Sequence, residues 1–232
     1  MNIAEKLTTI AENQQRVYDK GYADGSQSAP TGTTELPSYC AIPFWNAFGE
    51  KEVVVDVPSR TDFYRFMYRN EVNTTVEHIT LNGSQNGTIT SMKECFSGLT
   101  SSIDNTLKRL TLNCDFSNCT IFNDLCVNLR TLEVIDGIPI DFSSATSAIQ
   151  IFGWCNALKE FRVKPQTIKI SLPLGTVEPI SNDTIQSIVD GLADLTGQTS
   201  QTMTFGFNPS TKLTNEQTLA MTAKNWAVSL MD

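Results

Sequence analysis

A short apolar motif that recurs four times between residues 76 and 163 most constrains the fold. In each copy, three apolar residues stand at the first, fourth and sixth positions. The copies are Val76–Leu81, Leu107–Leu112, Leu129–Val134 and Leu158–Val163. One such segment is too short to bury an apolar face alone, so neighbouring copies must stack. The motif therefore predicts short parallel strands with apolar residues inward and the intervening side chains outward.

A second element accompanies the last two copies. Phe122 is followed by Cys126 and Leu129, and Phe152 is followed by Cys155 and Leu158. We interpret this element as a return segment that covers the strands. The six cysteines are best explained as small buried apolar residues, because free cysteine is among the most buried residue types. Pairing of Cys114 with Cys119 across a turn stays open.

Together, the two elements resemble the leucine-rich repeats of the BspA-like subfamily, over roughly residues 76–210. The closing phrases Leu213–Gln217 and Lys224–Trp226 and the opening Ile3–Asn13 are similar to those of leucine-rich-repeat proteins encoded in tail regions of phages and prophages of gut Firmicutes. The resemblance implies an α/β fold, a short solenoid with a parallel sheet. It also implies a non-enzymatic virion protein of the tail or baseplate.

The N-terminal segment predicts a separate helix over residues 2–22. Its apolar stripe has the 3.5-residue period of a coiled coil. The seam residues are Ile3, Leu7, Ile10, Gln14 and Val17. Isoleucine at several seam positions favours more than two strands, so we expect a homo-oligomer, with a trimer favoured. A helix folded back on its own domain is the alternative. Residues 23–38 are a Pro/Gly-punctuated linker.

Residues 39–75 are interpreted as an N-terminal cap of the repeat domain, which spans residues 76–232 and ends in a helical cap. The cap region predicts a strand over Val53–Val57 and a short helix from Thr61. The outward side of that helix is a second candidate patch, since Tyr and Arg recur at interfaces. This patch consists of Tyr64, Arg65, Tyr68 and Arg69. A plain end cap is the alternative.

The C-terminal third predicts two helices and a strand. An amphipathic helix spans 182–196, with Gly197 as its stop. A strand follows at Met203–Phe207. The last helix has Thr214 as N-cap and Gln217 at the capping-box position, and it continues through Trp226 and Ala227.

The outward side chains of the four strands form the candidate binding face. One column contains His78, Arg109, Thr131 and Glu160, and the next contains Thr80, Thr111, Glu133 and Arg162. Stacking in register would place Glu133 beside Arg162. Such a face is the usual binding surface of a solenoid. An ordinary solvated face with weak ion pairs is the alternative.

Composition narrows the function classes. The net charge of −8 argues against nucleic acid and against anionic membranes as partners. The chain has one histidine and no phosphate-loop or nucleophile-elbow motif, so we expect no enzyme, no catalytic residues, no cofactor and no metal.

No signal peptide or membrane span is expected, so the protein would assemble in the host cytoplasm and face outward in the virion. The expected partners are further copies of this chain, other virion proteins and a host-surface glycan or protein. A bacterial cell-surface adhesin and a purely structural decoration protein are the alternatives.

Overall fold

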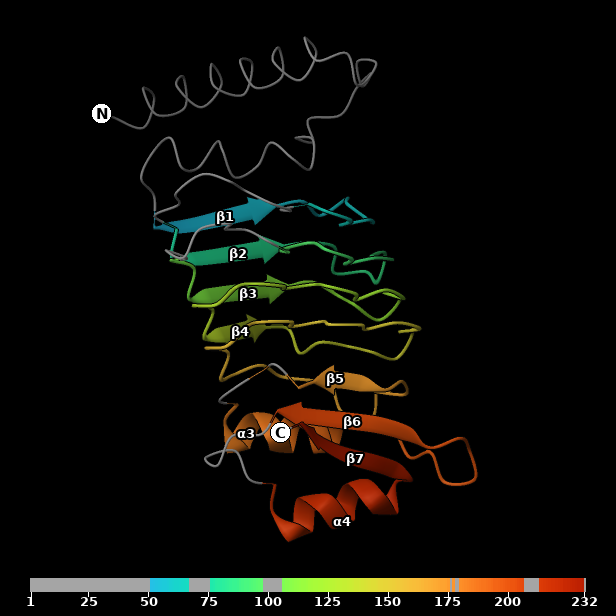
Figure 1. The fold of residues 1–232 in the computed structure, drawn as a ribbon. Coiled ribbons are helices and arrows are strands. Elements are labelled where there is room, and N and C mark those ends of the chain that lie inside the picture. The colour runs from blue at the N-terminus through green and yellow to red at the C-terminus, as the bar shows by residue number, and fades with distance from the viewer. Residues whose placement is uncertain are drawn as a thin grey trace, which may run out of the picture.

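The computed structural model describes residues 51–66, 76–97, 106–175, 177, 180–206 and 213–231. The predicted N-terminal helix with its seam residues, the 23–38 linker and most of the 39–75 region therefore lie outside the described residues, as do Cys40, Tyr68 and Arg69. The described part is an α/β structure with two parallel sheets and two helices (Figure 1).

The first sheet contains the strands that the apolar motif predicts. Its order is β1-β2-β3-β4, and every pair is parallel. The strands are β1 (Glu52–Asp56), β2 (His78–Asn82), β3 (Arg109–Asn113) and β4 (Val134–Gly137). Isolated parallel bridges from Val134 to Glu160 and from Ile140 to Val163 extend the ladder. The prediction of parallel pairing is confirmed, and β1 joins the same sheet.

The predicted register of the third copy is wrong by three residues. Arg109 pairs with Val134, where the motif predicts Thr131. Leu132 can also stand first, with Ile135 at the fourth position, although Gly137 then occupies the sixth. The observed frame buries Leu129 and Leu132 and also Ile135, which the predicted frame would leave beyond the strand. The larger buried apolar area decides between the frames.

The second sheet runs along the other side of the stack. Its order is β5-β6-β7, again parallel, with β5 (Leu172–Leu174), β6 (Gln201–Gly206) and β7 (Trp226–Met231). Four earlier return segments form a line of parallel bridges, at Asp62, Ser91, Ile121 and Ser147. The strand predicted at 203–207 is confirmed over its described residues, 203–206. The predicted continuation of the last helix through Trp226 is wrong, because Trp226 opens β7.

The two described helices begin at the predicted residues. Helix α3 (Asn182–Gly191) has Ser181 as N-cap, and α4 (Asn215–Ala223) has the predicted capping box of Thr214 and Gln217. Helix α3 ends at Gly191, earlier than predicted, because Leu192 forms a parallel bridge with Ile168. Neither helix has the length and apolarity that crossing a membrane would need.

The short helix predicted from Thr61 is absent in the described part of that segment. Asp62 instead forms a parallel bridge with Ser91, and Phe63–Phe66 forms a turn. The turn directs Phe63 and Phe66 into the core, where their rings meet edge to face with centroids 5.3 Å apart. Burial of both rings favours the turn over a helix with one apolar side.

Threonine hydroxyls tie successive passes of the chain together. The hydroxyls of Thr90, Thr120 and Thr146 each donate to the carbonyl of the residue one pass earlier, at 3.1 Å in every case. These acceptors are Thr61, Thr90 and Thr120. The threonines thus form a ladder along the return segments, and their hydroxyls supplement the backbone ladder.

Helix α3 closes the edge of the first sheet. The backbone N–H groups of Phe161 and Val163 donate to the hydroxyls of Thr184 at 3.3 Å and Ser187 at 3.0 Å. These hydroxyls take the place of the carbonyls that another strand would supply. Covering an edge in this way prevents pairing with a foreign strand.

We expect Ser187→Ala to lower the free energy of unfolding by about 1 kcal/mol, because the Val163 N–H loses its acceptor. Ser187→Thr keeps the hydroxyl and is the matched control. Urea unfolding of both variants checks this. Equal stability of the alanine variant and the wild type would contradict the assigned role of the hydroxyl.

The core runs the length of the stack and contains the cysteines. All five described cysteines, at 95, 114, 119, 126 and 155, are free and buried. The interpretation as buried apolar residues is confirmed for these five, and Cys114 and Cys119 are not paired. Burial raises the pKa of Cys155 to about 12. A thiol in this environment is a core residue and not a nucleophile.

Candidate binding groove

An open groove of about 680 Å³ lies on the strand face at the α3 end of the first sheet. One wall is the outward side of β3, β4 and the bridged segment 160–163. The other wall is the exposed side of α3, including Asp183 and Ser187. Ile138 and Pro165 supply exposed apolar surface to the lining. The volume lies within the ~300–1,000 Å³ typical of ligand sites.

A hydrogen-bonded network fills the middle of the strand face. Asp136 is paired with Arg109 and also accepts from the Thr111 hydroxyl at 2.5 Å. Because that hydroxyl has a single proton, its oxygen accepts from Nε2 of His78, at 2.9 Å. Thr80 Oγ1 lies 3.4 Å from the same nitrogen. The network fixes His78 with a proton on Nε2 and leaves these side chains committed to one another.

The side chains of a second row on this face are also hydrogen-bonded to one another. The Asn113 amide donates to Asn82 at 2.8 Å, and the Asn82 amide donates to Asp56 at 2.7 Å. This ladder crosses β3, β2 and β1. Between the two networks, most polar groups of the central face already have partners within the chain.

Two of the eight predicted face residues lie elsewhere. Thr131 is at the corner before β4, where its hydroxyl donates to the Leu107 carbonyl at 3.0 Å. Glu133 pairs with Lys159 at 2.9 Å and not with Arg162. Both corrections follow from the three-residue shift of β4, the strand formed by the third copy of the motif.

Glu133 belongs to a charge ladder at the start of the strands. Backbone hydrogen bonds stack Lys51, Glu77, Lys108, Glu133 and Lys159 in this order, so the sign alternates at every step. Lys51 pairs with Glu77 at 2.7 Å, and the hydrogen bond from Lys51 holds the pKa of Glu77 below its ordinary value. These exposed pairs support the register of the stack, since a slip would bring like charges together.

Glu160, Arg162 and Asp183 have the only uncommitted charges on this part of the groove. All three side chains are exposed and line the groove. Within the described ranges, no hydrogen bond or ion pair engages any of them. Glu160 and Arg162 lie two residues apart on one extended segment, so both project from the same face. The groove therefore has side chains that pair with one another, such as Arg109 and Asp136, beside charged side chains of both signs that have no partner among the described residues.

Sequence reasoning missed Asp136, Asp183 and Ser187. Asp136 occupies the column position assigned to Glu133, and reading the motif from Leu132 would have found it. Asp183 and Ser187 lie on a helix whose packing against the sheet edge has no signal in the strand motif. Only the tertiary structure brings that helix to the groove.

The described half of the second candidate patch is engaged locally. Arg65 pairs with Glu94 at 2.7 Å, and its guanidinium lies 5.1 Å from the centre of the Tyr64 ring. Lys93 lies 5.4 Å from the same ring. Tyr64 is 42% exposed. These contacts fit a structural role for Tyr64 and Arg65.

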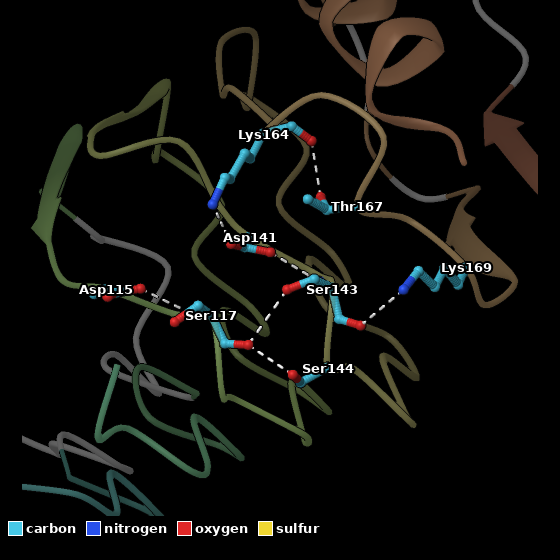
Figure 2. Close-up of polar contacts among 8 residues, drawn as sticks. All are labelled: Asp115, Ser117, Asp141, Ser143, Ser144, Lys164, Thr167 and Lys169. Carbon is cyan, nitrogen blue, oxygen red and sulfur yellow. Dashed lines mark hydrogen bonds and ion pairs between the residues drawn. The ribbon is translucent and has the colours of Figure 1, made fainter. Parts of the chain in front are cut away.

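A polar cluster forms among the loops that follow β3 and β4 and the segment from Lys164 to Lys169 (Figure 2). The side chain of Asp141 is only 5% exposed and accepts from Lys164 Nζ at 2.7 Å. It also accepts from the backbone N–H of Ser143 at 2.8 Å. Burial alone would raise the pKa of Asp141, but the hydrogen bonds from Lys164 and Ser143 outweigh it and hold the pKa below its ordinary value. Because the hydroxyls of Ser143 and Ser144 also donate to the Ser117 carbonyl, the cluster joins three passes of the chain.

We expect Asp141→Asn to lower the free energy of unfolding by about 1–3 kcal/mol at neutral pH, because a charge-assisted hydrogen bond is lost. The folded-state pKa is lowered, so this stabilisation is present above the unfolded value of ~3.9 and is lost as the pH falls through the folded pKa. Urea unfolding of both proteins should show the difference shrinking in acid. Asp115→Asn, at the equivalent turn one pass earlier, is the control, and a difference independent of pH would contradict the assignment.

Neither a metal-ligand cluster among the described residues nor a known relative assigns a role to the groove. Among the described residues, no three His, Cys, Asp or Glu side chains are placed to hold a metal ion. Comparison with protein-family models, with curated protein sequences and with solved structures finds no match to this chain. The arguments for function therefore rest on the groove and on the sequence resemblance.

Proposed function

We propose that this chain is a non-enzymatic attachment protein of a phage particle, in which the two parallel sheets form one solenoid of the leucine-rich-repeat type. The N-terminal helix anchors the chain in the tail or baseplate as an oligomer, and the strand face meets the host surface. The observation that carries the binding role is the groove, where uncommitted Glu160, Arg162 and Asp183 surround an open volume of about 680 Å³. The sequence resemblance supports the place in the particle.

The binding role accounts for the distribution of partners on the strand face. Several charges elsewhere on the strand side pair within the chain, as Lys51 does with Glu77, Lys159 with Glu133 and Arg109 with Asp136. The groove end instead exposes charged groups without partners, although pairing within the chain is frequent elsewhere. Exposed polar groups held on rigid elements are the usual basis of specific recognition.

The place in the particle is tested by immunogold electron microscopy. Antibody against the full chain is applied to phage particles from a strain that encodes it, and particles from a deletion strain are the control. Labelling at the tail or baseplate is expected. Labelling of the bacterial surface alone would instead support a cell-surface adhesin.

Attachment is tested with the fluorescently labelled full chain on a panel of Firmicutes cells, read by flow cytometry. We expect binding to some strains, and loss of binding in the double variant Glu160→Gln/Arg162→Ala. The double variant Glu52→Gln/Arg130→Ala removes the same two charges from exposed sites outside the groove and should bind as the wild type does. Equal binding by both double variants would exclude the groove.

Oligomerisation is tested by light scattering during size-exclusion chromatography. The full chain should elute as an oligomer, with a trimer favoured, because isoleucine recurs in its predicted seam. A chain that begins at Leu36 should elute as a monomer. A monomeric full chain would exclude self-association through the N-terminal helix.

A further inference from the structure

We infer that the groove recognises an uncharged, polyhydroxylated ligand, a neutral oligosaccharide of the host surface. The inference rests on the proposed function and names its ligand class. It derives from the charged side chains of the lining that have no partner within the described part of the chain, and from those that already pair within it.

The free groups are donors and acceptors side by side. The Arg162 guanidinium can only donate hydrogen bonds, and the Glu160 carboxylate can only accept them. They project from the same face of one segment, and Asp183 lies on the facing wall. A sugar hydroxyl both donates and accepts, so adjacent hydroxyls can satisfy both kinds of group. Planar guanidinium and carboxylate groups can each bind two neighbouring hydroxyls.

A ligand of a single charge sign fits this arrangement less well. An anion bound by Arg162 would lie near the like-charged Glu160, and a cation bound by Glu160 would lie near Arg162. The lining contains four carboxylates and two arginines, and one of those arginines is already paired with Asp136. An acidic glycan is therefore repelled by the groove and by the net charge of the chain.

The remaining surface suits the apolar faces of a sugar ring. Ile138 is 37% exposed, and Pro165 is exposed beside it in the lining. The groove is open to solvent. A folded protein partner would need a larger complementary surface, of roughly 800 Å² on each side.

The ligand class is tested with the wild-type full chain on an array of neutral, acidic and amine-bearing oligosaccharides. We expect binding to neutral members, and affinity reduced roughly tenfold or more in Glu160→Gln/Arg162→Ala, since each lost charge-assisted hydrogen bond contributes at least a factor of ten. Glu52→Gln/Arg130→Ala should bind as the wild type does. Binding only to acidic or amine-bearing members would overturn the inference.

A cell-based arm separates this inference from the proposed function. Periodate, which cleaves vicinal diols, should abolish binding of the labelled chain to cells, and protease treatment of the cells should leave it intact. Groove-dependent binding that survives periodate but not protease would assign a protein partner and overturn the ligand class alone. Cell binding that the groove variant leaves unchanged would overturn the groove itself.

Discussion

Gly137→Ala should lower the free energy of unfolding by about 3 kcal/mol or more, the sum of backbone strain and a clash with main chain. Gly137 ends β4 with a φ of +95°, which side chains disfavour. A Cβ there would lie 2.6 Å from the carbonyl oxygen of Leu112, its partner in β3. That atom belongs to the sheet and cannot move aside without breaking the ladder.

Gly197→Ala is the matched control for this effect. Gly197 also has a positive φ, of +78°, but a Cβ added there has no atom within 4 Å. We expect a loss of only about 1–2 kcal/mol, from backbone strain alone. Urea unfolding of both variants therefore separates strain from clash. Equal losses would show that β4 does not approach β3 as closely as described.

Phe122→Ala should lower the free energy of unfolding by about 3–5 kcal/mol, the usual effect of emptying a phenylalanine site in a core. The side chain is fully buried. Its ring centre lies 6.0 Å from that of Phe116 and 4.8 Å from that of Phe142. Phe116 and Phe142 lie in the loops after β3 and β4, and Phe122 lies in a return segment, so the cavity would weaken contacts between successive passes of the chain.

Leu219→Ala is the control for the loss of an apolar side chain. Leu219 is 68% exposed on α4, and alanine suits a helix equally well. The expected change is within about 0.5 kcal/mol. A large loss at Leu219, or a small one at Phe122, would contradict the assigned core.

The parallel strands could be predicted because the apolar motif has the period of a strand and is repeated. In β2 and β3, even the register is as predicted, with His78 opposite Arg109 and Thr80 opposite Thr111. The frame of β4 was not predicted, because the frame that begins at Leu129 has apolar residues at all three motif positions, whereas the frame that begins at Leu132 has Gly137 at the sixth. Only the packing of Ile135 and the close approach of Gly137 to β3 select one frame.

The alternation of side chains along a strand also predicted part of the candidate site. Arg109, Glu160 and Arg162 were assigned to the outward face from strand alternation, and they line the groove. Asp136 was missed because the predicted frame of β4 was wrong. Thr131 was assigned to the face, although its hydroxyl serves the corner of the stack.

The sequence by itself determined that the repeated apolar segments lie in parallel strands and that α4 begins at its capping box, because these features depend on local periodicity and on single capping residues. The tertiary structure alone decided that the hydroxyls of Thr184 and Ser187 close the sheet edge, and that α3 thereby becomes a wall of the groove. It also decided which charges are paired and which stay free. Pairing depends on distances between passes of the chain some 25 residues apart, and spacing along a sequence with uneven repeats does not fix those distances.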